Sequence, residues 1–131
     1  MYPFRPKSTD HLKPGQFWSF KVDGDRFVAG VVLALRREDG HIARRIFLAG
    51  LLDWSGDAIP DSRELDSRPF RERGFAHIKA ITENGGEILG EIRPCWDLPS
   101  EVEQTDSIST WGYGVIRVYG QKYYGRRAAI V

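Results

Sequence analysis

The sequence predicts a mainly β domain with minor α content: a small, strongly bent antiparallel sheet, or an SH3-like partial barrel, with one or two short helices. One observation behind this class is the alternation of apolar and polar side chains within residues 13–35, which is typical of half-buried strands. Another is composition, because 14 Gly and 7 Pro in 131 residues favour a turn-rich β architecture over a helical bundle. The length predicts a single domain, residues 1–131, that is large enough to bury a core.

The sheet is expected to be founded on a hairpin formed by residues 13–35. Apolar side chains alternate with polar ones from Trp18 to Val22, and Asp23-Gly24 then supplies a pair of residues that tolerates the positive φ angles of a tight turn. The returning strand, residues 27–35, is apolar at odd and even positions alike. A strand of that kind is buried on both faces, so we expect it at the centre of the sheet.

The register of this hairpin depends on the length of its loop. A two-residue turn places Phe20 opposite Phe27, and a four-residue turn places it opposite Ala29. A three-residue loop would pair Phe20 with Val28 and set the bulkier apolar rows on opposite sides of the sheet. We therefore expect an even-length loop.

The segments on either side of the hairpin extend this plan. Residues 1–12 carry two prolines among polar groups and predict an extended N-terminal arm. After the hairpin, the charged residues 36–40 end in Asp39-Gly40 and predict a second tight reversal. The apolar content of residues 42–52 then predicts a third strand.

The middle of the chain has a weaker pattern. Residues 53–73 interleave acidic and basic side chains with two prolines, so they predict a long, solvated loop with one helical turn after Asp61. Residues 75–84 leave two interpretations open: a short helix ended by Gly85-Gly86, or two strands joined by a hairpin turn at Asn84-Gly85. The helix is the interpretation we favour.

The last third of the chain predicts one connector between two strands. Residues 87–92 are expected to form a strand that Pro94 ends. Residues 95–110 are expected to form a second acidic connector. Alternation resumes from Trp111 to Tyr124, which predicts a strand that closes the sheet. We interpret the tail, residues 123–127, as a solvated structural segment and not as a basic-aromatic nucleic-acid patch.

Charge and cysteine content argue against several classes of function. The chain has 19 Lys and Arg against 18 Asp and Glu, a formal net charge of +1, whereas dedicated nucleic-acid binders carry a clear basic excess. The single cysteine, Cys95, permits no internal disulfide; we expect a partly buried apolar residue, in keeping with a reducing cytosol. No run of about 18 apolar residues and no signal-peptide core occur, so we expect a soluble, cytoplasmic protein with no membrane partner.

The sequence offers no motif for metal binding, cofactor binding or catalysis. Three scattered histidines and Cys95 lack the spacing of a zinc site, and Gly112-Tyr113-Gly114 is too short for a phosphate-binding loop. No G-x-S-x-G elbow occurs, and no pair of carboxylates stands out from the charged background. We therefore expect no metal, no cofactor and no enzymatic activity.

Long charged segments that also carry aromatic residues are the places where we expect a partner surface. The first such segment, residues 53–73, contains Trp54, and the second, residues 99–111, ends at Trp111. Each is either a lid over the core or an anchor for a protein partner, with the nearby carboxylates as a charged rim. The candidate partner-binding residues are Trp54, Asp57, Asp61, Glu64, Asp66, Glu101, Glu103 and Trp111.

Two blocks of the sequence resemble the immunity protein 26 family of bacterial polymorphic-toxin systems. In residues 13–35, a Gly and an aromatic residue start a strand, an Asp-Gly turn follows, and the second strand has a small residue in its middle. In residues 75–92, a helical turn leads into an apolar strand that ends in an aliphatic residue and a Gly. The residues that carry the likeness are Gly15, Phe17, Asp23-Gly24, Phe27, Gly30 and Ile88-Leu89-Gly90.

The resemblance implies a non-catalytic protein that binds a cognate protein toxin and neutralises it by stoichiometric occlusion, and this is the function we favour. The alternative is a nucleic-acid-associated small β-barrel, since such folds often serve that role and Arg36, Arg37, Arg44 and Arg45 could face one way. A third possibility, a small-molecule enzyme acting in a barrel mouth, predicts a deep pocket with a titratable pair.

Overall fold

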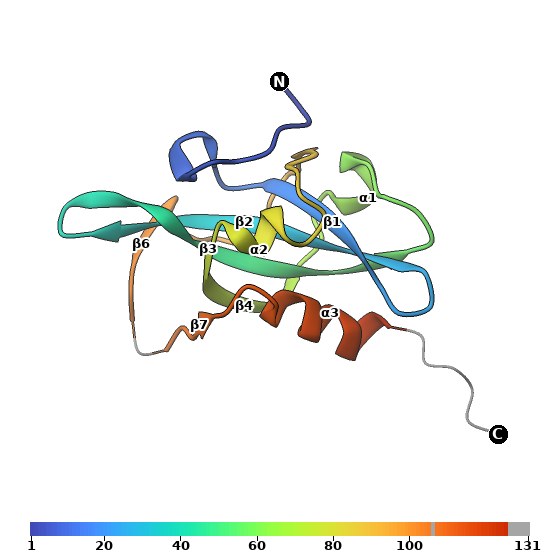
Figure 1. Cartoon of the computed structure of the whole chain (residues 1–131). Coiled ribbons are helices and arrows are strands. Elements are labelled where there is room, and N and C mark those ends of the chain that lie inside the picture. Colours follow the sequence, from blue (N-terminus) through green and yellow to red (C-terminus); the bar gives the residue numbers. More distant parts are fainter. Residues whose placement is uncertain (106, 126–131) are drawn as a thin grey trace.

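The computed structural model describes residues 1–105 and 107–125, and its mainly β architecture confirms the predicted class (Figure 1). Seven strands form one open, mixed sheet in the order β5-β1-β2-β3-β4-β7, with β6 beside β2. The strands are β1 (Gln16–Val22), β2 (Arg26–Glu38), β3 (His41–Gly56), β4 (Phe70–His77), β5 (Gly90–Glu91), β6 (Glu101–Glu103) and β7 (Thr110–Trp111). The helical elements are the 3₁₀ turn η1 (Thr9–His11) and the helices α1 (Ser62–Leu65), α2 (Lys79–Thr82) and α3 (Val115–Tyr124).

The long strands pair as the sequence predicts, in antiparallel fashion, but two short ones do not. The pairs β1–β2, β2–β3, β3–β4 and β1–β5 are antiparallel. The short strands β6 and β7 pair in parallel with β2 and β4. The sheet is therefore mixed and open.

Both faces of the sheet are covered, so the protein has a hydrophobic core on each side. On one face, Trp18 and Phe47 pack with residues of α2, α3 and the N-terminal arm. On the other, Phe17 and Phe75 pack with α1 and with residues 92–108. Figure 1 shows α3 along one face, and the β2–β3 turn at the opposite end of the molecule from α1. The central strand β2 lies between β1 and β3 and is buried on both sides, as its unbroken apolar run predicts.

The β1–β2 register corrects the expectation of an even-length loop. The loop has three residues, 23–25, and Phe20 pairs with Val28. Gly24 and Asp25 take positive φ angles of 78° and 58° in this loop. The expectation fails because it assumes that the larger apolar side chains of β1 and β2 all lie on the same face of the sheet. Because both faces are covered, the large side chains of β1 lie opposite smaller ones of β2, and the hydrophobic cores on both faces are filled.

The second reversal is confirmed at Asp39-Gly40. Their φ angles are 50° and 79°, and Glu38 pairs with His41 across this two-residue turn. The third strand is also confirmed, and it is longer than predicted because β3 continues to Gly56.

The predicted loop over residues 53–73 is wrong at both ends. β3 continues to Gly56 and β4 begins at Phe70, which leaves a connection of residues 57–69. The first half of β4 alternates between exposed and half-buried residues that are mostly charged, so it lacks an apolar strand signal. The helical turn after Asp61 is confirmed as α1, where Asp61 is the N-cap of a reciprocal capping box.

Residues 75–92 match the favoured interpretation in part. Residues 75–77 belong to β4, and only Lys79–Thr82 form the short helix α2. Gly85 and Gly86, with φ angles of 90° and 91°, follow the helix, so the alternative hairpin is wrong. Of the predicted strand over 87–92, only Gly90–Glu91 pair regularly, as β5.

The predicted C-terminal strand is wrong. Residues 115–124 form α3, and only Thr110–Trp111 pair as β7. Ile116 and Gly120, four residues apart, are the buried residues of this helix. Valine, isoleucine and tyrosine favour strands, but burial of one helical face against the sheet overrides that preference. Residues 126 and 127 of the predicted tail lie outside the described residues.

Candidate partner-binding surface

The two tryptophans predicted as candidate anchors are both buried. Trp54 is 6 % exposed and belongs to the core on the α1 side, and Trp111 is 5 % exposed and belongs to the core under α3. Each packs on a glycine: a Cβ at Gly56 would lie 2.6 Å from Cζ2 of Trp54, and one at Gly74 would overlap the Trp111 ring. The two side chains are therefore lids over the core, and neither offers a partner an exposed ring.

Four of the candidate acidic residues lie around α1, and three of them bind backbone N–H groups. The Asp61 carboxylate accepts a hydrogen bond from the N–H of Glu64 at 3.0 Å, and the Glu64 carboxylate accepts one from the N–H of Asp61 at 3.3 Å. Asp66 accepts another backbone N–H at 2.9 Å. Asp57 forms an ion pair of 2.7 Å with Arg26. These carboxylates fix the local chain as well as presenting negative charge.

The other two acidic candidates lie at the opposite end of the sheet. Glu101 and Glu103 belong to β6, and Glu101 forms an ion pair of 3.6 Å with Arg37. Arg26 and Arg37 are eleven residues apart on β2, which corresponds to as much as about 36 Å at roughly 3.3 Å per residue. The structure therefore does not bring the predicted site residues together on one surface.

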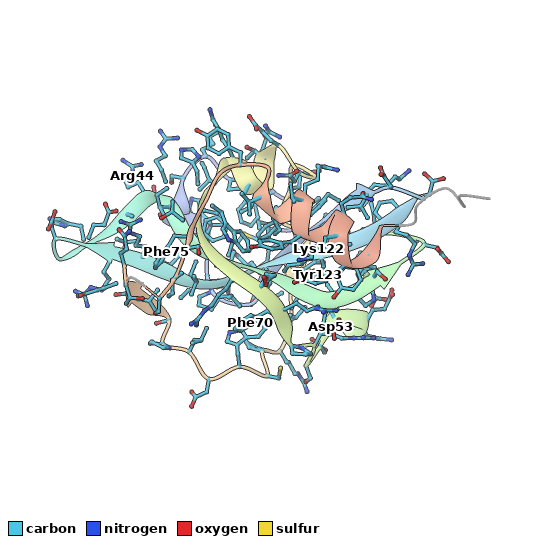
Figure 2. The ribbon with its side chains drawn as sticks, turned by 90° about the horizontal axis from the view of Figure 1, so that it is seen from below. Arg44, Asp53, Phe70, Phe75, Lys122 and Tyr123 are labelled. Atoms are coloured by element: carbon cyan, nitrogen blue, oxygen red, sulfur yellow. The ribbon has the colours of Figure 1, made fainter. Side chains whose placement is uncertain are left out.

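A groove of about 640 Å³ lies between the N-terminal arm and β3, and it brings basic residues of the arm beside Arg44 and Arg45, which no pattern in the sequence predicts. Its basic lining residues are Arg5 and Lys7 from the arm and Arg44 and Arg45 from β3. We call it the cationic groove. The Arg44 side chain is 74 % exposed and forms an ion pair of 3.3 Å with Asp10. Figure 2 shows Arg44 at the edge of the molecule, far from Asp53 and α3.

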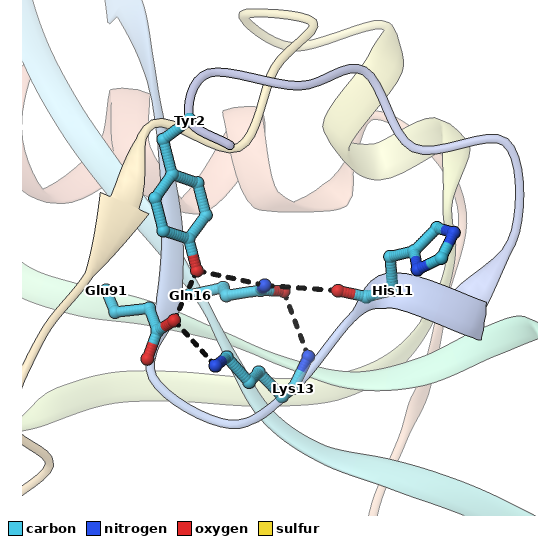
Figure 3. Close-up of polar contacts among 5 residues, drawn as sticks. All are labelled: Tyr2, His11, Lys13, Gln16 and Glu91. Carbon is cyan, nitrogen blue, oxygen red and sulfur yellow. Dashed lines mark hydrogen bonds and ion pairs between the residues drawn. The ribbon is translucent and has the colours of Figure 1, made fainter.

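The first part of the N-terminal arm is held by a polar network around Gln16 (Figure 3). The buried Gln16 amide donates to the Tyr2 hydroxyl at 3.2 Å and to the His11 carbonyl at 3.1 Å, and its oxygen accepts from the Lys13 N–H at 2.9 Å. The Tyr2 hydroxyl also donates to Glu91, which pairs with Lys13 Nζ at 2.8 Å. These hydrogen bonds, from Lys13 first, hold the pKa of the Glu91 carboxyl below its usual range.

The second part of the arm is fixed by η1. The buried Thr9 hydroxyl donates to the Ala43 carbonyl of β3 at 2.6 Å. β4 pairs with β3 only from Ile46 onward, so η1 contacts the stretch of β3 that precedes this pairing. This contact places the basic residues of the arm beside those of β3, and so creates the groove.

The four arginines named for the nucleic-acid alternative do not form one surface. Arg44 and Arg45 line the cationic groove, whereas Arg36 and Arg37 line a separate groove of about 550 Å³ at the β2–β3 turn. There Arg36 forms an ion pair of 2.8 Å with Glu38. The second groove therefore carries both signs of charge.

A third groove, of about 680 Å³, lies between the β1–β2 loop and α3. Arg117 is its most constrained cation: Nε donates to Asn84 Oδ1 at 2.9 Å, and Nη1 donates to the Lys21 carbonyl at 2.6 Å. Asp23 and Asp25 lie on the opposite wall. The Arg117 guanidinium thus joins α3 to β1 through its Nε and Nη1 donors.

The most strongly shifted pKa in the described chain belongs to a residue that anchors α3. The Tyr124 hydroxyl donates to Asp53 Oδ1 at 2.6 Å, and burial, reinforced by this carboxylate, raises the pKa of Tyr124 well above its ordinary value. The Arg71 guanidinium lies 4.1 Å from the centre of the neighbouring Tyr123 ring, a cation–π contact between β4 and α3. Both contacts tie the end of α3 to the sheet.

The remaining reactive groups can be placed as well. Cys95 is exposed, contrary to the expectation of a partly buried residue, because it lies in a connector that runs over the surface. Within residues 1–105 and 107–125, no three His, Cys, Asp or Glu side chains are grouped so as to hold a metal ion. No helix in this part of the chain is long and apolar enough to cross a membrane.

Comparisons of the chain with protein-family models, with curated proteins and with solved structures found no match. The resemblance to the immunity protein 26 family therefore rests on the residues of the two blocks named above, and it stays a prediction.

Proposed function

We propose that this chain is a bacterial, cytoplasmic immunity-type protein that binds a cognate protein toxin and neutralises it by occlusion, without catalysis. The observation that supports this proposal most is the proximity of the two blocks that carry the family resemblance. β1 pairs with β2 on one side and with β5 on the other, so Phe17 lies opposite both Val31 and Gly90. Residues that are distant in sequence thus form one structural unit.

Gly15 joins the two blocks directly. Its N–H donates to the Val32 carbonyl at 2.9 Å, and its own carbonyl accepts from the Ile92 N–H at 2.9 Å. Its φ angle is +95°, and a Cβ there would lie 2.9 Å from the Ile92 carbonyl oxygen. Because a glycine is needed at this junction, Gly15 supports the view that both blocks belong to one scaffold.

The distribution of charge also supports a binding role. The two cores are filled by apolar side chains, and the Arg, Lys, Asp and Glu residues that line the three grooves are exposed, except for Arg36, whose side chain is 14 % exposed. Binding by occlusion needs such an exterior, in which charged groups fix the orientation of the partner and a few desolvated groups hold it.

Co-purification tests the proposal. The chain, carrying an affinity tag, is co-expressed with the product of the neighbouring gene, and an unrelated toxin serves as the control. We expect the neighbour's product to be retained in a fixed molar ratio and its toxicity to be suppressed. Failure to retain or suppress any neighbouring product would contradict the proposal.

The cationic groove favours one second candidate, a nucleic-acid-associated protein. Four exposed or half-exposed cations along one groove would contact phosphates and release counterions, so binding would weaken steeply with added salt. A gel-shift titration with single-stranded and duplex DNA and RNA tests this candidate. Absence of a shifted band at low salt would remove it.

A further inference from the structure

The cationic groove concentrates positive charge that the rest of the chain does not share. Its lining residues include four Lys or Arg and one Asp, a net charge of +3 with His neutral, whereas the whole chain has +1. The remainder of the chain therefore has a net charge of −2. The protein is close to neutral as a whole, but its charge is segregated.

Most of this positive charge is not neutralised within the described part of the chain. Arg44 is the one basic lining residue with a carboxylate partner there, Asp10. Arg45 and Arg5 instead donate to backbone carbonyls, at 3.2 Å and 3.4 Å. A carbonyl dipole orients a guanidinium but leaves its net charge in place, and each guanidinium keeps further N–H donors for a partner. Arg5 and Arg45 are thus oriented but uncompensated, and Lys7 has no carboxylate partner among the described residues.

The groove also offers apolar surface. Met1, Phe4 and Pro6 line it beside the cations, and Phe4 stacks on Tyr2 with ring centres 5.9 Å apart. Arginine mixed with methionine and aromatic side chains is the composition of a protein–protein interface. A site for single-stranded nucleic acid would instead present an open aromatic ring for base stacking. Phe4 is half-buried against Tyr2 and offers no such open ring.

We propose that the cationic groove binds an acidic segment of a partner protein. Carboxylates of this segment would pair at the rim with Lys7 and with the N–H groups of Arg44 that do not contact Asp10, and an apolar side chain between them would lie against Phe4. The proposal rests on the proposed function, since under it the segment belongs to the toxin. It shifts the predicted partner surface from the acidic loops to a basic groove.

The test uses two double charge reversals of equal size. K7E/R44E alters the rim of the groove at two exposed side chains, of which Lys7 has no hydrogen bond from Nζ to the described residues. R63E/R93E is the control: both arginines are exposed beside α1, and their side chains form no ion pair within the described chain. Each variant changes the net charge by −4. The neutral variant K7Q/R44Q separates the loss of attraction from repulsion by the new carboxylates.

Affinity for the co-purified toxin is measured by calorimetry, with thermal unfolding as a check on folding. We expect K7E/R44E to raise Kd by about tenfold or more, K7Q/R44Q to raise it less, and R63E/R93E to leave it within about twofold. If the wild type binds the toxin and K7E/R44E binds as tightly, the groove proposal is overturned while the toxin-binding function stands. If the wild type itself does not bind, both fail.

A second arm of the experiment distinguishes the class of partner. The ¹⁵N-labelled protein is titrated with a capped peptide of sequence EELEE and, separately, with decathymidylate at the same ionic strength. We expect the peptide to shift amide signals of residues 5–11 and 43–46, and to do so less in K7E/R44E. Shifts at these residues from the oligonucleotide alone would overturn the proposal in favour of nucleic acid.

Discussion

Trp18 lies directly opposite Gly30 in the β1–β2 pair, and the missing side chain at Gly30 makes room for the indole ring. A Cβ at this position would overlap Trp18 and lie 2.9 Å from Cδ1 of Ile116 in α3. One contact therefore joins β1, β2 and α3. The strand register and the position of the C-terminal helix depend on each other at this point.

The Gly30→Ala substitution tests this dependence. The added methyl group has no space between Trp18 and Ile116, so we expect overpacking to lower the free energy of unfolding by about 1–3 kcal/mol in urea titrations. Gly114→Ala is the control, because nothing lies within 4 Å of a Cβ there, and its effect should stay within about 0.5 kcal/mol. Equal stability of G30A and the wild type would contradict the described packing.

The Gln16→Ala substitution tests how the N-terminal arm is held. It removes three hydrogen bonds and leaves the Lys13 N–H and the His11 carbonyl without their side-chain partner. We expect a loss of about 1–3 kcal/mol in stability, with faster amide exchange in residues 2–13. Gln104→Ala, which removes one hydrogen bond from Arg36 outside the arm, should leave amide exchange in residues 2–13 unchanged. Unaltered exchange in the arm of Q16A would show that the network does not hold it.

Stability in acid should depend on Glu91. Hydrogen bonds from Lys13 and Tyr2 lower the pKa of Glu91 below its ordinary 4.5. A carboxyl with a lowered pKa stabilises the fold above its unfolded pKa, and the contribution is lost as the pH falls through its folded pKa. We therefore expect the wild type to lose more stability than Glu91→Gln as the pH falls below about 4.5. Parallel stability curves for the two proteins would contradict this role of the ion pair.

Stability in alkali should depend on Tyr124. Burial and the Asp53 carboxylate raise its pKa above the ordinary value of 10.0, so the folded state holds the proton more tightly than the unfolded state. The stabilisation is complete below pH 10 and declines as the pH rises above it. We expect a shallower decline for Tyr124→Phe in thermal unfolding, and a loss of about 1 kcal/mol near neutral pH. Tyr113→Phe is the control at an exposed ring, and should follow the wild type.

The sequence contains enough local information for the hairpins but not for their register. Asp23-Gly24 and Asp39-Gly40 mark both turns, because positive φ angles have a local chemical signature. The three-residue loop at 23–25 sets the register that places Gly30 opposite Trp18 and beneath Ile116. This register is favourable because α3 covers the second face of the sheet and makes it a core. No local pattern carries that information.

The sequence predicts neither the C-terminal helix nor the cationic groove, and the reasons differ. In residues 113–119, the period-2 alternation and the strand preference of Val and Tyr both predict a strand. Ile116 and Gly120, the buried residues of α3, are four residues apart, which is a helical spacing. Arg44 and Arg45 stand out as a pair in the sequence. Lys7 reaches them across 38 residues only because η1 contacts β3, a long-range contact without a local signal.

The measurement that tests the central claim most directly is a titration of toxin activity with the purified protein. A binder that acts by occlusion inactivates one toxin molecule per protein molecule, so residual toxin activity should fall linearly and reach zero at one molar equivalent. The toxin should be recovered intact after denaturation of the complex. Full protection at a small fraction of an equivalent, or a covalently altered toxin, would mean that the protein acts catalytically and would contradict the account.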